Sequence, residues 1–239
     1  MVNTDSPVKG IIFDYGGTID SRGVHWSEVI WDGYRHCGVP VSKEDFREAY
    51  VFAERELART RHILPHHNFY DLLYIKMQIE LRYLVDKGLL PEIAVAQYAA
   101  LIARYCYEAA KNSVKEARPV LELLHAKYPM VLVSNFYGNV EAVLKDFDLR
   151  KYFGSIIESA VVGVRKPDPR IFSLGVEALG MRPEEVLVVG DSLKKDILPA
   201  ESIGCSTAWI KGKGWTPQED EATHPNTIYK LGDLLKTLL

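Results

Sequence analysis

Polar side chains follow three apolar segments of the sequence, at the points where strands of a sheet would end. The segment GIIFDYGGT carries Asp14 at the end of its apolar run and Thr18 in the glycine-rich loop. The segment MVLVSN ends in Ser134 and Asn135, and EVLVVGD ends in Asp191. Ligands of open α/β sheets bind beyond the carboxyl ends of the strands, so we expect these side chains to meet at one edge.

Two further residues are expected at the same edge. Lys166 lies in the loop after the short segment SIIES, where the following proline favours an extended backbone, and Asp196 follows Asp191 by five residues. Clustered carboxylates repel one another in a partly buried site, and Mg²⁺ relieves that repulsion with its preference for oxygen ligands. A lysine and a hydroxyl suit the oxygens of a phosphoryl group, whose transfer depends mainly on positioning and charge.

Two different periodicities of apolar residues predict the elements that position this cluster. From about residue 21 to 112, apolar residues recur at helical spacing, which predicts four amphipathic helices able to form a small bundle. Beyond it, strands alternate with helices, the first two of them at about 114–128 and 140–146. We predict a doubly wound, Rossmann-like parallel sheet core built from residues 1–20 and 113–239, with an inserted four-helix cap at residues 21–112.

Composition narrows the function classes. The net charge of −3 gives no basic field for nucleic acid or anionic lipid, so neither nucleic acid nor a membrane is an expected partner. The three cysteines lack any Cys-x-x-Cys pair, and no apolar run approaches the length of a membrane span. The short polar segment before the first strand does not resemble a secretory signal. We therefore expect a cytoplasmic protein; the sequence does not specify its oligomeric state.

Four segments together resemble the motifs of the haloacid dehalogenase-like (HAD) superfamily. They are FDYGGT, VSNF, GVRKPDPRIF and GDSLKKD, and they occur in the right order with suitable spacing. The helical insertion after the first motif is similar to the C1 cap of subfamily I, so the resemblance extends over essentially the whole chain. It implies a Mg²⁺-dependent hydrolase, most simply a phosphatase, that acts on a small phosphorylated metabolite.

The resemblance also implies a role for each site residue. Asp14 would be the nucleophile that forms an aspartyl-phosphate, and Lys166 would steady the nucleophile and the transferring group. Ser134 would bind a phosphoryl oxygen, with Thr18 and Asn135 beside it. The implied metal ligands are Asp14, Asp191, Asp196 and the backbone carbonyl of Gly16. Two alternatives stay open, because Asn135 can simply fix its loop and Asp196 can cap its helix.

The sequence departs from the family pattern at Gly16. Phosphatases of this family normally have an aspartate there, which protonates the leaving oxygen and activates water, help that is typically worth about 10²–10⁴-fold. A slower phosphatase, an acyl-phosphate substrate that needs no proton, phosphonatase or dehalogenase chemistry, and a Mg²⁺- or phosphate-binding protein without turnover all remain open. The retained nucleophile, lysine and acidic residues favour a phosphatase. Asp20, Arg22 and His25 closely follow the first motif and are candidates to replace the missing acid.

Other polar residues of the expected cap have simpler interpretations. The segment RHILPHHN brings three histidines together, but its proline breaks the helix that would align them, so we expect a solvated loop. Three arginines in ELARTRH are expected at the surface, with an anion clamp as the alternative. A phosphonatase would need a cap lysine, and we expect the lysines of these helices to be solvated. The residues concerned are His62, His66, His67, Arg55, Arg59, Arg61, Lys43, Lys76, Lys87 and Lys111.

Overall fold

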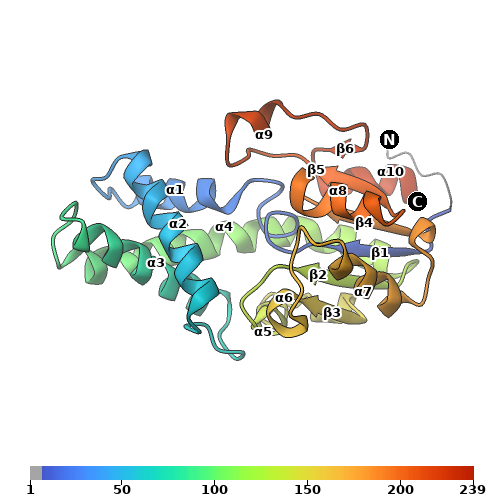
Figure 1. The fold of residues 1–239 in the computed structure, drawn as a ribbon, viewed down its shortest axis with the longest axis horizontal. Coiled ribbons are helices and arrows are strands. Elements are labelled where there is room, and N and C mark those ends of the chain that lie inside the picture. The colour runs from blue at the N-terminus through green and yellow to red at the C-terminus, as the bar shows by residue number, and fades with distance from the viewer. Residues whose placement is uncertain (1–6) are drawn as a thin grey trace.

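The computed structural model describes residues 7–239 and contains a six-stranded sheet (Figure 1). The strands lie in the order β3-β2-β1-β4-β5-β6, and every neighbouring pair is parallel. This architecture confirms the predicted α/β fold with a Rossmann-like parallel sheet. The strands are β1 (Gly10–Phe13), β2 (Met130–Ser134), β3 (Ser155–Glu158), β4 (Val186–Gly190), β5 (Ser206–Ile210) and β6 (Thr227–Ile228).

Helices connect these strands. Four of them join β1 to β2: α1 (Trp26–His36), α2 (Lys43–Arg59), α3 (Phe69–Asp86) and α4 (Ala94–His125). The others follow β2: α5 (Val140–Asp146), α6 (Ser159–Val162), α7 (Arg170–Leu179), α8 (Leu198–Ser202), α9 (Pro217–Glu221) and α10 (Leu235–Leu238). In the part of the chain that the structure describes, no helix is long and apolar enough to cross a bilayer.

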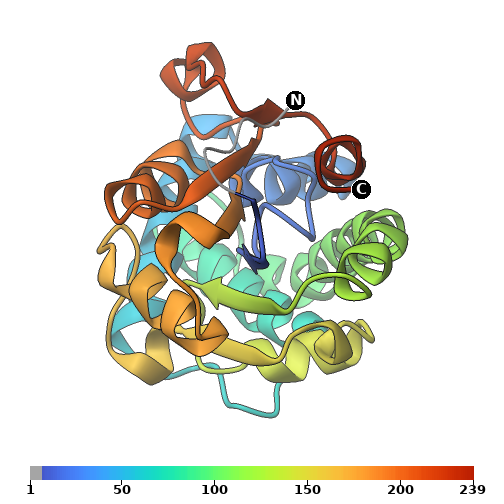
Figure 2. The same cartoon turned by 90° about the vertical axis from the view of Figure 1, so that its right-hand side faces the viewer.

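Successive residues of the central strands enter two apolar cores, one on each face of the sheet. Ile11 and Phe13 of β1 pack with residues of α4, α5 and the C-terminal segment, whereas Ile12 packs with residues of α7 and α8. Figure 2 shows α4 and α7 on opposite sides of the sheet. Because helices cover both faces, the central strands are uninterrupted apolar runs, as expected for buried parallel strands.

The helices α1, α2, α3 and the N-terminal half of α4 form a layer beyond one end of the sheet (Figure 1), which we call the cap. Asn68 begins α3, since its side chain accepts a hydrogen bond from the backbone N–H of Asp71 at 2.9 Å. The separate helices expected before and after residue 112 are wrong, because α4 continues through this point. Cys106, Ala110 and Val114 are buried at a spacing of four, and nothing between them breaks a helix. The limits 21–112 stay a prediction.

The order of the strands defines where a ligand should bind. The chain forms β1, β2 and β3 outward in one direction and then crosses back to place β4 on the other side of β1. The switch point of the topology therefore lies between β1 and β4, and ligands of such sheets bind beyond the carboxyl ends of the strands at this point. Asp14 follows β1 and Asp191 follows β4, so both residues stand at the switch point.

Candidate active site

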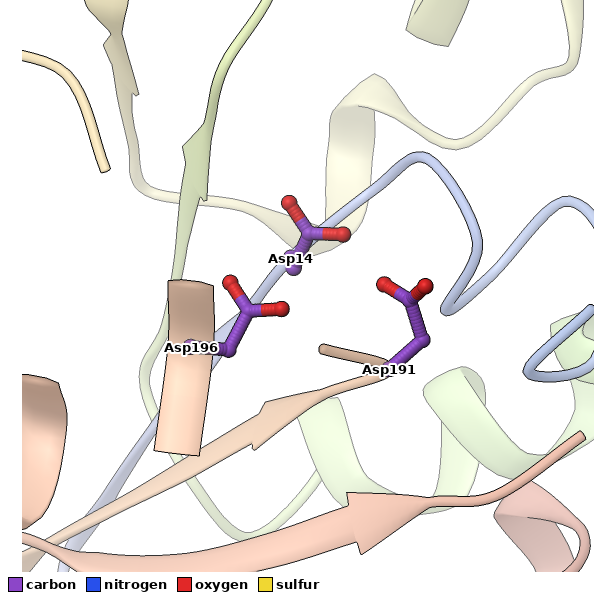
Figure 3. A group of neighbouring side chains, drawn as sticks. All are labelled: Asp14, Asp191 and Asp196. Carbon is purple, nitrogen blue, oxygen red and sulfur yellow. The ribbon is translucent and has the colours of Figure 1, made fainter. Parts of the chain in front are cut away.

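Three carboxylates meet beyond the carboxyl ends of β1 and β4 (Figure 3). Asp14 and Asp191 follow these strands directly, and Asp196 comes from the π-helical turn at Leu193–Ile197. One oxygen of each carboxylate lies within 4.8 Å of the others, a spacing that could hold a metal ion. Figure 3 shows the three side chains turned toward a common centre. The expected convergence of these residues at one edge is therefore found.

Lys166 lies among these carboxylates. Its Nζ atom is 2.5 Å from Asp14 Oδ1 and 2.6 Å from Asp196 Oδ1, and the residue is only 4% exposed. Burial alone would lower the pKa of the ammonium, but the Asp14 and Asp196 carboxylates outweigh burial and raise it. Asn135 holds the lysine backbone, since its Oδ1 accepts from Lys166 N at 2.9 Å and its Nδ2 donates to Lys166 O at 3.1 Å.

Two hydroxyl groups complete the surroundings of Asp14. Ser134 Oγ donates to Asp14 Oδ1 at 3.2 Å, and Thr18 Oγ1 lies 3.1 Å from Asp14 Oδ2 and 3.3 Å from Asp191 Oδ1. Trp209 on β5 donates its indole N–H to the backbone oxygen of Asp191 at 2.7 Å and so fixes the turn that carries Asp191. Sequence reasoning missed this last contact, because Trp209 lies outside the four motifs and has the pattern of an ordinary strand residue.

The cluster carries more negative than positive charge. Burial, followed by the Asp14 and Asp196 carboxylates, raises the pKa of Asp191 well above its usual range. Burial also raises the pKa of Asp196, although Lys166 acts in the opposite direction. Three carboxylates face one ammonium, so negative charge is in excess. A divalent cation would offset this excess and bind the carboxylate oxygens, so these residues fit the Mg²⁺ that the fold implies. Asp196 has a second function, because its Oδ2 accepts from Ser192 N at 3.0 Å.

Glycines allow the backbone to approach these carboxylates. Gly17 has φ +96°, and a Cβ atom there would lie 2.3 Å from Asp191 Cγ. Gly16 is different, because its φ lies outside the left-handed region and the nearest atom to an added Cβ would be Trp26 Cδ1 at 4.0 Å. The backbone at position 16 therefore accepts a Cβ atom without a clash.

The three candidates to replace the missing acid lie in different surroundings. Asp20 is buried in the lining of the cleft and accepts hydrogen bonds from Gly17 N at 2.8 Å and from the Trp26 indole at 3.1 Å. Burial is the main reason that its pKa rises to about 7. Burial lowers the pKa of His25 to about 4. Arg22 is outside the residues that line the cleft and pairs with Glu116 Oε1 at 2.8 Å.

A cleft of about 1500 Å³ joins this cluster to the cap. The expectation that the cap lysines are solvated is wrong for Lys76, which is 4% exposed and lines the cleft in contact with Glu54. Tyr137 from the core donates its hydroxyl to Glu54 at 3.0 Å. The sequence held a signal for this contact: Lys76 and Glu80 fall on the apolar stripe of α3 with Leu72, Met77 and Leu84, where polar residues are unusual.

The histidine and arginine segment lies outside the acidic cluster. Within residues 7–239, Asp14, Asp191 and Asp196 are the one group of three His, Cys, Asp or Glu side chains that lie close enough together to hold a metal ion. His62 instead pairs with Glu56 at 3.0 Å, and the rings of His66 and His67 contact each other edge to face. The segment is a loop, as predicted. The arginines that line the mouth of the cleft are Arg55, Arg59 and Arg61.

The carboxylates and the lysine thus lie at the switch point of a parallel sheet, faced by a helical cap, which is where Rossmann-like α/β proteins bind their ligands. The sequence profile of the haloacid dehalogenase-like hydrolases matches residues 8–204, and the chain therefore belongs to this family of hydrolases. The match runs from the start of β1 to the turn before β5, so it includes all the residues of the cluster.

Individual relatives agree with this assignment. The chain is 36% identical over 91 residues to the phosphoserine phosphatase of Thermus thermophilus, which covers 38% of this chain and 35% of that protein. It is 32% identical over 161 residues to the phosphoglycolate phosphatase of Salmonella typhimurium, with 64% and 63% covered. The matches thus span less than two thirds of these relatives. A solved dehalogenase structure covers 99% of both chains with a TM-score of 0.63 at 19% identity, a likeness of fold alone.

Proposed function

We propose that this protein is a phosphatase that hydrolyses a small phosphorylated metabolite with Mg²⁺, through an aspartyl-phosphate on Asp14. The observation that carries the proposal is the contact of a buried lysine with Asp14 and Asp196 at the switch point of the sheet. The phosphatases among the relatives, which act on phosphoserine and phosphoglycolate, support the same reaction class.

In the first step, an Asp14 oxygen would form a bond to phosphorus while the bond from phosphorus to the leaving oxygen breaks. The Lys166 ammonium, within 2.5 Å of Asp14, and the Ser134 hydroxyl, within 3.2 Å, are placed to donate to the transferring phosphoryl oxygens. Thr18 holds the other Asp14 oxygen, so the carboxylate keeps one orientation. In the second step, water would release phosphate and restore the carboxylate.

The metal-binding residues in this proposal are Asp14, Asp191, Asp196 and the backbone carbonyl of Gly16. Bound Mg²⁺ would supply charge neutralisation for the phosphoryl oxygens and for the crowded carboxylates. The backbone at Gly17 and the Trp209 contact keep Asp191 in place for this purpose.

Asp20 and His25 are poor substitutes for an aspartate at position 16. Both Asp20 oxygens already accept N–H hydrogen bonds from Gly17 and Trp26, which hold this carboxyl in the loop although burial raises its pKa to about 7. Burial lowers the pKa of His25 to about 4, so its ring carries no extra proton at neutral pH. The leaving oxygen would then depart with little acid assistance. We therefore expect turnover to be fastest for acyl and aryl phosphates, whose leaving groups need no proton.

Phosphonatase chemistry is less well supported. It would need an unprotonated cap lysine, and Lys76 is the buried one. Burial opposes its charge, but Glu54 and other neighbours outweigh burial and raise the pKa of Lys76, which keeps the amine protonated. Dehalogenases of this family do not need the acidic, metal-binding fourth motif, so the presence of Asp191 and Asp196 argues against dehalogenase chemistry.

The test compares the native protein with Asp14→Asn and with Asp168→Asn, an aspartate that pairs with Arg170 outside the cleft. Hydrolysis of acetyl phosphate and p-nitrophenyl phosphate is measured with Mg²⁺ and with a chelator, and protein-bound phosphate is measured after an acid quench. We expect turnover and bound phosphate only with Mg²⁺ and an intact Asp14, with Asp168→Asn unaffected. A native protein that hydrolyses neither compound would contradict the proposal and favour a phosphate-binding role.

A further inference from the structure

The wall of the cleft opposite the core contains an ion pair between two cap helices. Lys76 of α3 contacts Glu54 of α2, and Tyr137, which follows β2 in the core, donates its hydroxyl to Glu54 Oε1 at 3.0 Å and lies 3.2 Å from Oε2. All three residues line the same cleft as Asp14. The contact therefore joins the cap to the core inside the cleft that also contains Asp14.

The pair keeps hydrogen-bonding capacity toward the cleft. Lys76 has three donors. One is directed to Glu54, and the ammonium lies 4.1 Å from the ring centroid of Tyr50. Among the described residues Lys76 makes no other hydrogen bond, so donor capacity is left over. The Glu54 side chain is 36% exposed, which leaves its carboxylate open to a ligand.

A role in stability alone explains this pair poorly. Two charges removed from water lose much of their hydration, and a well-packed apolar pair of similar volume is often as stable or more so. Lys76 takes up a position on the apolar stripe of α3 that would ordinarily hold such a residue. An ion pair in that place is instead suited to recognise a ligand with groups of both kinds.

The charges around the pair nearly cancel. Burial raises the pKa of Glu80 to about 8, so at pH 7 its carboxyl beside Lys76 is mostly protonated, and His25 is neutral. Lys195 faces Glu54 from the core side, and Arg55, Arg59 and Arg61 also line the cleft. All four residues are exposed, so water and salt screen their charges. A leaving group with an added negative charge would meet Glu54 at this wall without a free buried cation.

We propose that Lys76, Glu54 and Tyr137 form the subsite for the leaving group, and that this subsite selects a leaving group that carries hydrogen-bond donors and acceptors without net charge. Hydroxyl groups of a polyol and the ammonium and carboxylate of a zwitterionic amino acid share this chemistry. The inference rests on the proposed function only in placing the phosphoryl group at Asp14. Lys76 and Glu54 act here as specificity-determining residues.

The test measures binding, so that it does not depend on turnover. Asp14→Asn protein with Mg²⁺ is titrated by calorimetry with glycerol 1-phosphate, phosphoserine and phosphoglycolate, alone and combined with Glu54→Gln or Lys76→Gln. Glu48→Gln is the control, because Glu48 is an exposed residue of the same helix outside the cleft. Thermal unfolding confirms that each variant is folded, and Glu54→Gln keeps the shape of the side chain if Lys76→Gln proves unstable.

We expect Asp14→Asn protein to bind glycerol 1-phosphate or phosphoserine more tightly than phosphoglycolate, and Glu54→Gln to shift the ratio toward phosphoglycolate by about tenfold or more. Glu48→Gln should leave the ratio unchanged. Binding of phosphoserine without glycerol 1-phosphate would identify the zwitterion as the ligand, and the reverse would identify the polyol. A ratio that Glu54→Gln leaves unchanged, tighter binding of phosphoglycolate at the start, or binding of none of the three would overturn the inference. Acetyl phosphate turnover by the native protein reports separately on the proposed function.

Discussion

Replacement of Gly16 by aspartate is the sharpest perturbation that the site allows. The backbone at Gly16 lies outside the left-handed region, and the nearest atom to an added Cβ is Trp26 Cδ1 at 4.0 Å. A Cβ atom at position 16 therefore fits without a clash. Gly16 lines the cleft, so the carboxyl group of Gly16→Asp would join the cleft two residues from Asp14.

The expected gain depends on the leaving group. A positioned general acid typically contributes about 10²–10⁴-fold, and this help matters where the leaving oxygen is a poor one. Gly16→Asp should therefore raise kcat for an alkyl phosphate such as glycerol 1-phosphate by about 10²-fold or more, and should raise kcat for acetyl phosphate much less. The slope of log kcat against leaving-group pKa, measured across aryl and alkyl phosphates, should become shallower.

The same variant should also affect stability. A fourth carboxylate joins three whose oxygens already lie within 4.8 Å of one another. Two like charges 4 Å apart repel by about 4 kcal/mol at an effective dielectric constant of 20. We expect Gly16→Asp to unfold at a lower temperature than the native protein in a chelator, and Mg²⁺ to remove most of the difference.

Gly16→Asn is the matched control, because it has nearly the same shape and cannot act as an acid. If Gly16→Asn increases the alkyl phosphate rate as much as Gly16→Asp does, the gain comes from shape or from hydrogen bonding. Equal gains for acetyl phosphate and glycerol 1-phosphate would also refute the reasoning, since they would show that proton donation to the leaving oxygen does not limit the native protein.

Three further predictions concern the buried charges and the loop backbone. Lys166→Met should abolish turnover, and in a chelator it should lower the free energy of unfolding by about 3–5 kcal/mol, because it leaves Asp14 and Asp196 without their buried partner. Urea unfolding measures this loss, and added Mg²⁺ should restore part of it. Gly17→Ala should cost about 1–3 kcal/mol and weaken Mg²⁺ binding, since φ is +96° and the new Cβ would clash with Asp191; unchanged Mg²⁺ affinity by calorimetry would contradict this. Burial raises the pKa of Glu80 from 4.5 to about 8, so the contribution of its neutral carboxyl to stability is present below pH 4.5 and is lost as the pH rises through 8. Urea titrations should therefore give Glu80→Gln the same free energy of unfolding as the native protein at pH 4. At pH 8.5 the free energy of unfolding of Glu80→Gln should be higher by about 1–3 kcal/mol.

Much of the architecture could be predicted from the sequence, because local patterns specified it. The strands around Asp14 and Asp191 are buried on both faces, so they appear as continuous apolar runs, and the order of strands and helices then brings their ends together. The start of α3 at Asn68 was predictable from a capping side chain. The length of α4 was not, because the break expected near residue 112 rested on an assumed boundary between cap and core.

The cap wall of the cleft could not be predicted in the same way. The motifs that place Lys166 and Asp196 beside Asp14 lie at the ends of strands, where topology alone sets the neighbours. Lys76 and Glu54 come from two different helices, and their contact depends on the rotation of α3 against α2 and on how the cap meets Tyr137. The sequence shows a lysine on the apolar stripe of a helix, but it does not show which carboxylate that lysine will contact.

The charged cluster around Asp14 and the missing side chain at Gly16 together indicate which leaving groups the site suits. A site that had lost its function would have no physical need to keep Lys166 buried between two carboxylates, because an isolated charge there is costly and an apolar side chain would pack at lower cost. The missing side chain at position 16 removes help to the leaving group, but it leaves the nucleophile, the lysine and the acidic residues in place. The combination is therefore suited to leaving groups that depart without a proton, and the leaving-group series of Gly16→Asp measures this property directly.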